Sequence, residues 1–291
     1  MGPVGLVLVG IFSVQAGAAI AGTQFGVTDP IVLVGLRLMF SAAVLGVVVR
    51  PRLRGHSRRD WQLLWWYAGS LLVMNVAIYE SFSRIPLGVA VTIEFLGPIA
   101  VALVSAIRAG RQGWWGLLWV ALAAAGVLGL GLSPTLDLDW WGVTLAVIAA
   151  AGWASYIWAG SRIAATELGP STTLAIASLM CAAATVVPMV VVGGPALLDP
   201  RLLAVGLGIA VLSSVIPYSA ELRALRWLPA GTFGILMSVE PAVATLMGLL
   251  ILDQQLSWLG WGSIACVMLA SIGVTWQQAY ADRTSAREVG G

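Results

Sequence analysis

Two glutamates in apolar surroundings are the residues of this chain best suited to chemistry. Glu94 lies in the run Glu94-Phe95-Leu96-Gly97-Pro98, and Glu240 directly precedes Pro241. An ionisable side chain within an apolar span is costly, so it marks a candidate functional site by default. Burial favours the neutral form of a carboxyl group, which makes Glu94 a candidate proton carrier. Because Pro98 has no N–H group, it also leaves the Glu94 carbonyl oxygen free as an acceptor.

A structural role is the alternative for both glutamates. Glu94 would then pair permanently with Arg37, an arginine that lies within an apolar run. Arg37 could equally bind a carboxylate ligand through the parallel N–H groups of its guanidinium. Glu240 could simply mark a kink, because a residue before proline is biased away from the helical conformation. The residues alone leave these alternatives open.

Further polar side chains lie within other apolar runs: Gln15, Asn75, Tyr79, Trp153, Tyr156 and Tyr218. Asn75 and Tyr79 are four residues apart, and Trp153 and Tyr156 are three apart, so each pair shares a helix face. Hydrogen bonding between helices would explain each position equally well. The spacing does not show that these faces meet in one cavity.

The composition excludes several classes of protein. The chain is 59% hydrophobic and 10% charged, against roughly 45–50% and 25% for soluble domains. A net charge of +2 is too small to indicate a nucleic-acid partner. One histidine, His56, and two cysteines in apolar runs leave no material for a metal site or a histidine-dependent triad. No nucleotide-binding loop is present, so we expect neither a cofactor nor ATP as the energy source.

The apolar runs have the length of membrane spans. A helix that crosses a bilayer needs about 20 mostly apolar residues. Ten stretches meet this requirement, at 3–22, 30–49, 64–82, 87–107, 113–132, 140–160, 171–192, 202–220, 231–252 and 257–277. No positive residue precedes the first stretch, so we expect a retained span and not a cleaved signal peptide. The sequence therefore predicts an all-α polytopic membrane protein with ten transmembrane helices.

The arginines predict the orientation of these spans. Most of them fall in alternate connections: Arg50, Arg52, Arg54, Arg58, Arg59, Arg108, Arg111, Arg162, Arg223, Arg226, Arg283 and Arg287. Only Arg84 and Arg201 fall in connections on the opposite side. Positive residues are enriched in cytoplasmic loops. We therefore expect both termini in the cytoplasm and the protein in the inner (plasma) membrane.

A proline and glycine pattern recurs in the two halves at one constant offset. The pairs are Pro86 with Pro229, Gly88 with Gly231, Pro98 with Pro241, and Leu103 with Leu246. In this register Gly97, not Glu94, is the counterpart of Glu240. Internal symmetry is typical of transporters built from repeats. Because five spans are an odd number, the second copy enters from the opposite face. We expect inverted repeats over 3–132 and 140–277, with a cytoplasmic tail at 278–291.

These motifs resemble the EamA family of the drug/metabolite transporter superfamily, and its threonine/homoserine exporter branch in particular. The resemblance rests on residues 85–103, 153–157, 216–219 and 232–242. It implies two inverted five-helix repeats around a central cavity lined by spans one, three, four, six, eight and nine. When the family's cavity positions are carried over to this sequence, the resemblance implies eight candidate substrate-binding residues: Gln15, Asn75, Tyr79, Glu94, Trp153, Tyr156, Tyr218 and Glu240.

The residues and the resemblance together predict a secondary transporter that exports small neutral amino acids such as threonine or homoserine. Protons would be exchanged for the substrate, with Glu94 as the proton-coupling residue, and the lipid bilayer would be the remaining partner. The alternative is a broad exporter of cationic drugs or other metabolites. A membrane-embedded enzyme or lipid-handling protein is more remote, because the chain offers no nucleophile–base pair. Nothing in the sequence indicates the oligomeric state.

Overall fold

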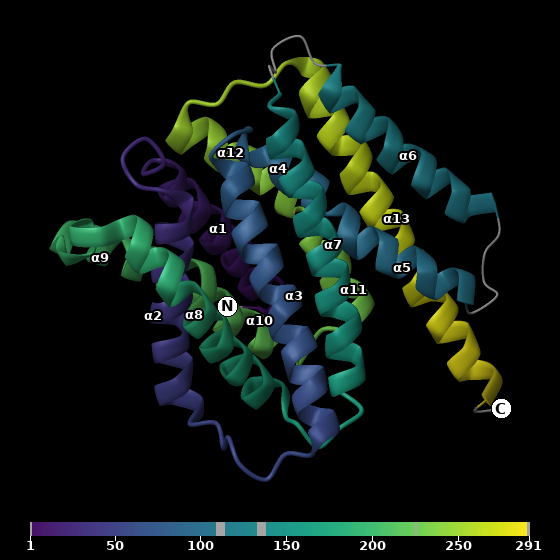
Figure 1. Ribbon diagram of the computed structural model, residues 1–291. Coiled ribbons are helices and arrows are strands. Elements are labelled where there is room, and N and C mark those ends of the chain that lie inside the picture. The colour runs from purple at the N-terminus through teal and green to yellow at the C-terminus, as the bar shows by residue number, and fades with distance from the viewer. Residues whose placement is uncertain (1, 109–113, 133–137, 225, 290–291) are drawn as a thin grey trace.

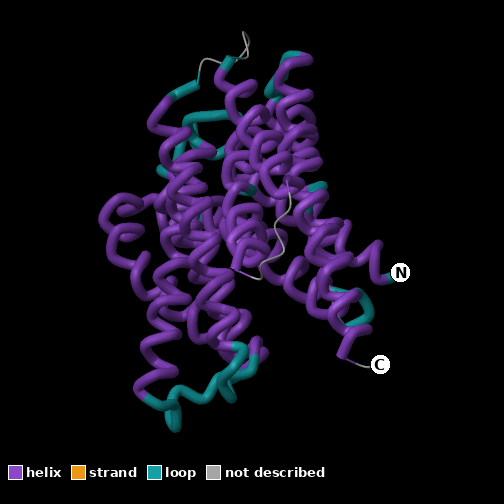
Figure 2. Tube along the Cα trace, turned by 90° about the vertical axis from the view of Figure 1, so that its right-hand side faces the viewer, coloured by secondary structure: helices purple, strands orange, loops and turns teal. Residues whose placement is uncertain are grey.

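The computed structural model describes residues 2–108, 114–132, 138–224 and 226–289. Within these residues every regular element is a helix, and no strand is found (Figures 1 and 2). The longer helices lie side by side in one bundle, joined at its two ends by short connections (Figure 2). The predicted all-helical fold class is confirmed for this part of the chain.

The first half of the chain contains six helices. Their bounds are α1 Pro3–Gly22, α2 Pro30–Val49, α3 Arg58–Phe82, α4 Leu87–Glu94, α5 Leu96–Arg108 and α6 Trp114–Gly131. Most ends agree closely with the predicted spans, but α3 begins well before residue 64. Ser57 and Asp60 form a reciprocal capping box that extends this helix into the arginine-rich connection. The predicted first residue of the fifth span, 113, lies outside the described residues.

The second half contains the remaining elements. They are α7 Trp140–Ile163, α8 Pro170–Gly193, η1 Gly194–Leu198, α9 Pro200–Ala210, η2 Val211–Val215, α10 Ile216–Ala224, α11 Ala230–Met237, α12 Glu240–Leu252 and α13 Trp258–Val289. The predicted span 257–277 continues as helix through most of the predicted tail. Alanine, glutamine, arginine and glutamate in this stretch are good helix formers, so loss of hydrophobicity does not end the helix.

Eight helical segments are long and apolar enough to cross a membrane. They include α1, α2, α7 and α8, and also continuous apolar stretches that pass through the interrupted helices. The described apolar part of α6, Leu118–Gly131, is shorter. The helix α3 is long but less apolar, since it carries Trp65, Trp66 and Asn75. The polytopic membrane fold is therefore present, while the count of ten spans and their orientation stay predictions.

Three predicted spans are interrupted helices. The span 87–107 breaks at Phe95, between α4 and α5, and the span 231–252 breaks at Ser238 and Val239. Each break comes shortly before a repeat-related proline, Pro98 or Pro241, whose missing N–H group weakens the helix at that point. The span 202–220 contains the five-residue π-helical turn η2. Broken helices at membrane depth are tolerated where they are buried in protein or line a cavity.

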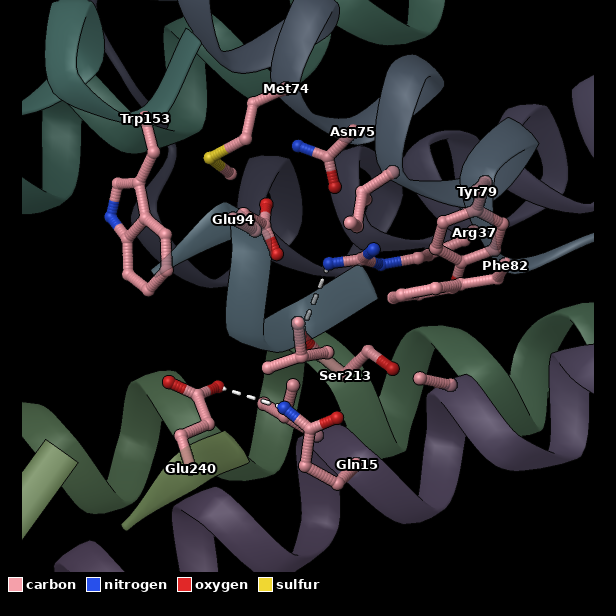
Figure 3. A pocket seen from close by; sticks show the side chains of 14 residues that line it. Gln15, Arg37, Met74, Asn75, Tyr79, Phe82, Glu94, Trp153, Ser213 and Glu240 are labelled. Atoms are coloured by element: carbon pink, nitrogen blue, oxygen red, sulfur yellow. Dashed lines mark hydrogen bonds between the residues drawn. The ribbon is translucent and has the colours of Figure 1, made fainter. Parts of the chain in front are cut away.

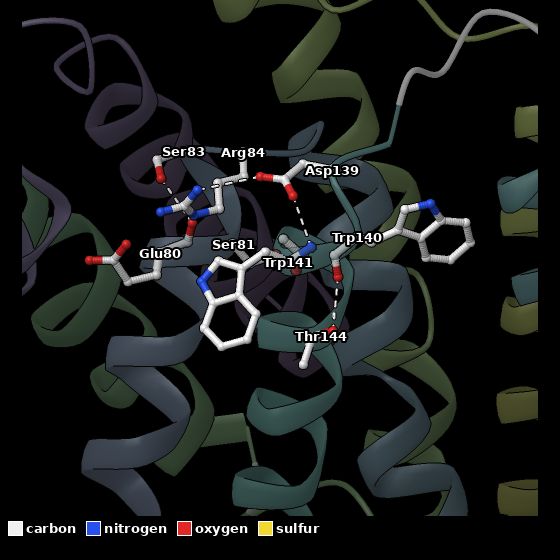
Figure 4. Close-up of polar contacts among 9 residues, drawn as sticks. Glu80, Ser81, Ser83, Arg84, Asp139, Trp140, Trp141 and Thr144 are labelled. Atoms are coloured by element: carbon white, nitrogen blue, oxygen red, sulfur yellow. Dashed lines mark hydrogen bonds and ion pairs between the residues drawn. The ribbon is translucent and has the colours of Figure 1, made fainter.

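Aspartates fix the start of several helices. Asp29, Asp139 and Asp199 each accept a hydrogen bond from the backbone N–H two residues later, at 2.8–2.9 Å. Such caps satisfy N–H groups that have no partner within the helix. Figure 4 shows Asp139 between the Trp141 backbone and the Arg84 guanidinium, which lies 3.4 Å away. The Trp141 N–H group, followed by Arg84, lowers the pKa of Asp139.

The interrupted helices form the centre of the bundle. The glycine of the repeated motif, Gly88 on α4, lies against Thr245 on α12, where a side-chain carbon on the glycine would be only 2.8 Å from the Thr245 Cα. Gly97 on α5 contacts the backbone of Ala150 on α7 in the same manner. Small residues allow this close approach between helices in lipid. By contrast, α6 and α13 pack against each other at the edge of the bundle (Figure 1).

Candidate cavity at the centre of the bundle

A cavity of about 140 Å³ lies between the interrupted helices and α1, α2, α3 and α7 (Figure 3). Its walls combine apolar side chains with buried polar ones. The lining residues are Val14, Gln15, Ala18, Arg37, Met74, Asn75, Ile78, Tyr79, Phe82, Val91, Glu94, Trp153, Ser213 and Glu240. Every span that was expected to line the cavity contributes at least one lining residue, and α2 contributes Arg37 in addition.

The cavity brings together most of the predicted binding residues: Gln15, Asn75, Tyr79, Glu94, Trp153 and Glu240. Tyr156 and Tyr218 are not among its lining residues. The Tyr67 hydroxyl instead donates to the Tyr156 hydroxyl at 2.8 Å. Three residues along a helix amount to about 4.5 Å of rise. Tyr156 therefore shares a face with Trp153 but lies beyond the cavity. The binding role of all eight residues stays a prediction.

Glu94 is the last residue of α4 and its carboxyl group points into the cavity (Figure 3). The side chain is 9% exposed. Within the described residues, no hydrogen bond to this carboxyl group is found. Because α5 begins at Leu96, Glu94 lies where the C-terminal end of one helix meets the N-terminal end of the next, and the partial charges of the two ends oppose each other. No hydrogen-bond donor among the described residues stabilises a negative charge on Glu94.

Glu240 lies at the corresponding break in the second half of the chain. It is the first residue of α12, shortly after α11 ends at Met237. The Gln15 side-chain amide donates to Glu240 Oε1 at 3.0 Å (Figure 3). The second carboxylate oxygen, Oε2, is buried and has no partner among the described residues. Glu240 is thus held in place by protein contacts, whereas Glu94 is not.

Arg37 projects from α2 into the same cavity. Its guanidinium carbon lies 5.3 Å from the centre of the Tyr79 ring, and Nη2 donates to the Ser213 carbonyl oxygen at 3.5 Å. This hydrogen bond is long, because N–H···O distances are typically 2.7–3.2 Å. No ion pair within 4.0 Å joins Arg37 to Glu94 or to another described acidic residue. The structural pairing of Arg37 with Glu94 is therefore not formed in this structure.

The Ser213 carbonyl is available because of a local feature of the predicted eighth span. Pro217 has no N–H group to donate to the carbonyls of Ser213 and Leu212, its fourth and fifth preceding residues. The backbone forms the π-helical turn η2 at this point, a feature that is frequent at functional sites. The Ser13 hydroxyl donates to the Leu212 carbonyl at 2.6 Å. Ser13 of α1 and Arg37 of α2 therefore donate hydrogen bonds to the two carbonyl oxygens that Pro217 leaves without a backbone donor.

Buried polar atoms without partners concentrate on the residues that line this cavity. Six such side-chain atoms occur in the described structure, and all but Thr173 Oγ1 belong to lining residues. The five are Gln15 Oε1, Arg37 Nε, Tyr79 OH, Ser213 Oγ and Glu240 Oε2. A buried polar atom without a partner costs about 1–3 kcal/mol. This arrangement is suited to a small ligand that carries both hydrogen-bond donors and acceptors.

Sequence reasoning missed Ser213 as a lining residue. A serine in an apolar helix is common and costs little free energy, so its presence alone does not indicate a binding site. The available signal was Pro217, which indicates a disturbed backbone one turn earlier. Glu221, on α10 beyond Pro217, was also not singled out. Its Cγ and Oε1 atoms lie beside Gly10 of α1, outside the cavity.

Comparisons with known proteins agree with this architecture. Residues 140–276 match the EamA-like transporter family. The threonine/homoserine exporter RhtA of Escherichia coli (strain K12) is 38% identical over 277 residues, which cover 94% of this chain and 91% of the relative. RhtA of Salmonella typhimurium (strain LT2) matches with the same identity and coverage. One crystal structure aligns with a TM-score of 0.61 at 18% identity, covering 93% of this chain and 97% of the other. That structural likeness shows the fold alone.

Proposed function

Because this chain belongs to the EamA-like transporter family, we propose that it exports small neutral amino acids such as threonine and homoserine. It is a multi-pass protein of the cell membrane and a transporter, not an enzyme. The resemblance found in its motifs is confirmed by the relatives. The substrate proposal comes from the relatives named as threonine/homoserine exporters.

The observation that carries the proposal is the set of unpartnered polar atoms around one central cavity. A neutral amino acid has an ammonium group, which needs acceptors, and a carboxylate, which needs donors. Acceptors are present at Glu94, at Glu240 Oε2 and at Gln15 Oε1. Donors are present on the same lining. A single small zwitterion could therefore satisfy groups that the protein leaves without partners.

The size of the cavity supports an amino acid over a drug. Pockets for drug-sized ligands occupy about 300–1,000 Å³, whereas this cavity measures about 140 Å³. Met74, Phe82 and Trp153 form part of its apolar wall. These bulky side chains leave room for a short side chain such as that of threonine. They disfavour the large planar cations that the rival drug exporter would carry.

Proton exchange would drive the export. No hydrogen bond to the Glu94 carboxyl group is found among the described residues, so a proton or a substrate ammonium group can each neutralise it. If the two compete for this carboxyl group, one must leave before the other binds, which is the requirement for antiport. Glu240, already hydrogen-bonded by Gln15, would contribute an acceptor without carrying the proton.

Counterflow in proteoliposomes tests the proposed substrate class. Liposomes that contain the purified protein are loaded with unlabelled threonine, and the entry of labelled threonine, homoserine, tryptophan or ethidium is measured. We expect rapid exchange of threonine and homoserine and little exchange of the two larger compounds. Liposomes without protein provide the control. Ethidium exchange without threonine exchange would contradict the proposal and favour the drug exporter.

A further inference from the structure

The guanidinium of Arg37 is poorly compensated for a buried cation. Its one described hydrogen bond is the long contact to the Ser213 carbonyl, at 3.5 Å. Its Nε atom is buried and has no described partner. No described acidic side chain approaches it within 4.0 Å. A buried charge normally requires a partner of opposite charge and further hydrogen bonds, so the protein alone does not complete this site.

Two further groups without partners lie on the same lining as Arg37. The Tyr79 hydroxyl is buried without a described partner, and the Tyr79 ring faces the guanidinium at 5.3 Å. The Ser213 hydroxyl is also buried without one, but it packs against Gly17 of α1, and it is the carbonyl of Ser213 that contacts Arg37. All three side chains can donate a hydrogen bond. Figure 3 shows Arg37, Tyr79 and Ser213 around one end of the cavity.

Acidic groups occupy a different part of the lining. Glu240 is held by Gln15, and both lie together on the wall formed by α1 and α12 (Figure 3). Glu94 lies beside Arg37, across the cavity from this pair (Figure 3). The cavity therefore carries both a cation and carboxyl groups, at separate positions on its wall. This is the charge distribution that a zwitterion requires.

We propose that Arg37 binds the carboxylate of the transported amino acid, with the Tyr79 hydroxyl as an additional donor. This inference rests on the proposed function and assigns one end of its substrate. A guanidinium presents parallel N–H groups that match the two oxygens of a carboxylate. The substrate would thus supply the negative charge that Arg37 lacks, and Glu94 would remain free to receive the ammonium group.

Asn75 is less suited to this role, although it lines the same cavity. Its side-chain amide already donates to the Leu71 carbonyl oxygen at 2.7 Å. The amide is also neutral, and hydrogen bonds to charged groups are strongest when the donor carries a charge. Asn75 can orient the ligand, whereas Arg37 distinguishes ligands that have a carboxylate from those that do not.

The test compares threonine with its amino alcohol, in which a hydroxymethyl group replaces the carboxylate. Each compound is used to inhibit the counterflow of labelled threonine in proteoliposomes. Wild-type protein should prefer threonine by about tenfold to a hundredfold, the range expected for a charge-assisted hydrogen bond. Arg37→Gln should lose most of this preference, because it weakens threonine binding but hardly affects the amino alcohol. Residual labelled exchange by the variant is measured at raised substrate concentration.

Arg84→Gln is the matched control, because Arg84 is half exposed and pairs with Asp139 away from the cavity. It should keep the wild-type preference. If Arg37→Gln is not recovered as a folded protein, the same comparison is made with Tyr79→Phe, which keeps the ring and removes only the hydroxyl. This variant should lower the preference for threonine over the amino alcohol several-fold. An undiminished preference in the folded Arg37→Gln protein, or in Tyr79→Phe, would overturn the assignment. Wild-type protein that exchanges no amino acid would contradict the proposed function itself.

Discussion

Two glutamates share one cavity but differ in their hydrogen bonding. Glu94 ends α4 just before α5 begins, and Glu240 begins α12 just after α11 ends. Gln15 donates a hydrogen bond to Glu240, while no described residue donates one to Glu94. Hydrogen bonding therefore distinguishes the two carboxyl groups. Under the proposed function, Glu94 would exchange the proton and Glu240 would remain a fixed acceptor.

This difference predicts a mild effect of Glu240→Gln. The amide oxygen of the new side chain can still accept the hydrogen bond from Gln15. We expect the response to a pH gradient to persist, with substrate affinity weakened by about two- to tenfold through loss of a net hydrogen bond. The concentration of threonine that gives half-maximal counterflow measures this change. A complete loss of gradient-driven accumulation would show instead that Glu240 carries the proton.

The residue scale also shows what helical spacing can predict. Glu94 and Glu240 were identifiable because charge in an apolar run is rare and costly. Spacing predicted that Trp153 and Tyr156 share a helix face, but it did not show that only Trp153 lines the cavity. Spacing gives the direction in which a side chain points, while depth along the helix depends on packing with its neighbours. Here Tyr156 lies beyond the cavity and accepts a hydrogen bond from Tyr67.

At the scale of elements, the repeated glycines and prolines produce interrupted helices that can cross closely. Pro98 and Pro241 follow the breaks in two spans, so α4 and α12 end or begin at the centre of the bundle. Gly88 lets α4 approach Thr245 of α12. The same crossing positions Glu94 and Glu240 on one cavity. The motif that recurs in the sequence is thus the motif that builds the site.

Gly88→Ala should therefore destabilise the fold. The added methyl group would overlap the Thr245 side chain and lie 2.8 Å from its Cα atom, and the backbone cannot move aside without separating α4 from α12. Overpacking of this kind costs about 1–3 kcal/mol. Thermal unfolding in detergent should show a lower midpoint for this variant.

Gly69→Ala provides the matched control within α3. Apart from its neighbours along α3, no atom lies within 4 Å of the position that its new side-chain carbon would take. Alanine is a better helix former than glycine, so the midpoint should stay the same or rise. Equal midpoints for Gly88→Ala and Gly69→Ala would mean that the α4–α12 crossing is looser than the structure shows.

Element boundaries were largely predictable from the sequence, but interruptions within elements were not. Hydrophobic length and aspartate caps indicate where helices begin, as at Asp29 and Asp199. The breaks at Phe95 and Ser238, and the turn η2, fall inside continuous apolar runs. A hydropathy profile does not reveal these interruptions, because the local backbone geometry changes while the residues stay apolar. Only the nearby prolines gave a signal.

At the scale of the whole molecule, helices from the two halves are interleaved. α2 packs against α8, α3 packs against α7, and α4 packs against α12. The central cavity therefore receives residues from both halves of the chain. Division into inverted repeats at 3–132 and 140–277 is consistent with this arrangement and stays a prediction. In a transporter of this kind, one repeat would rock against the other around the site.

The predicted orientation can be tested with topology reporters. A phosphatase fused after Gly291, or inserted in the arginine-rich connection at 50–57, should be inactive, and a fluorescent protein there should be fluorescent. This expectation follows from the arginines that gather on one side. An insertion after Gly26, where no side chain crowds the backbone, should give the opposite pattern. Phosphatase activity at the first two positions would reverse the orientation.

The most direct test of proton-coupled export is the response of Glu94→Gln to an imposed pH gradient. Labelled threonine is supplied to everted membrane vesicles or proteoliposomes, with and without the gradient, and its accumulation is followed. Wild-type protein should concentrate threonine only when the gradient is present. Glu94→Gln should lose this accumulation and still exchange threonine by counterflow, because glutamine keeps the shape and a carbonyl acceptor but carries no exchangeable acidic proton. Normal gradient-driven accumulation by Glu94→Gln would contradict the account and assign proton coupling to another residue.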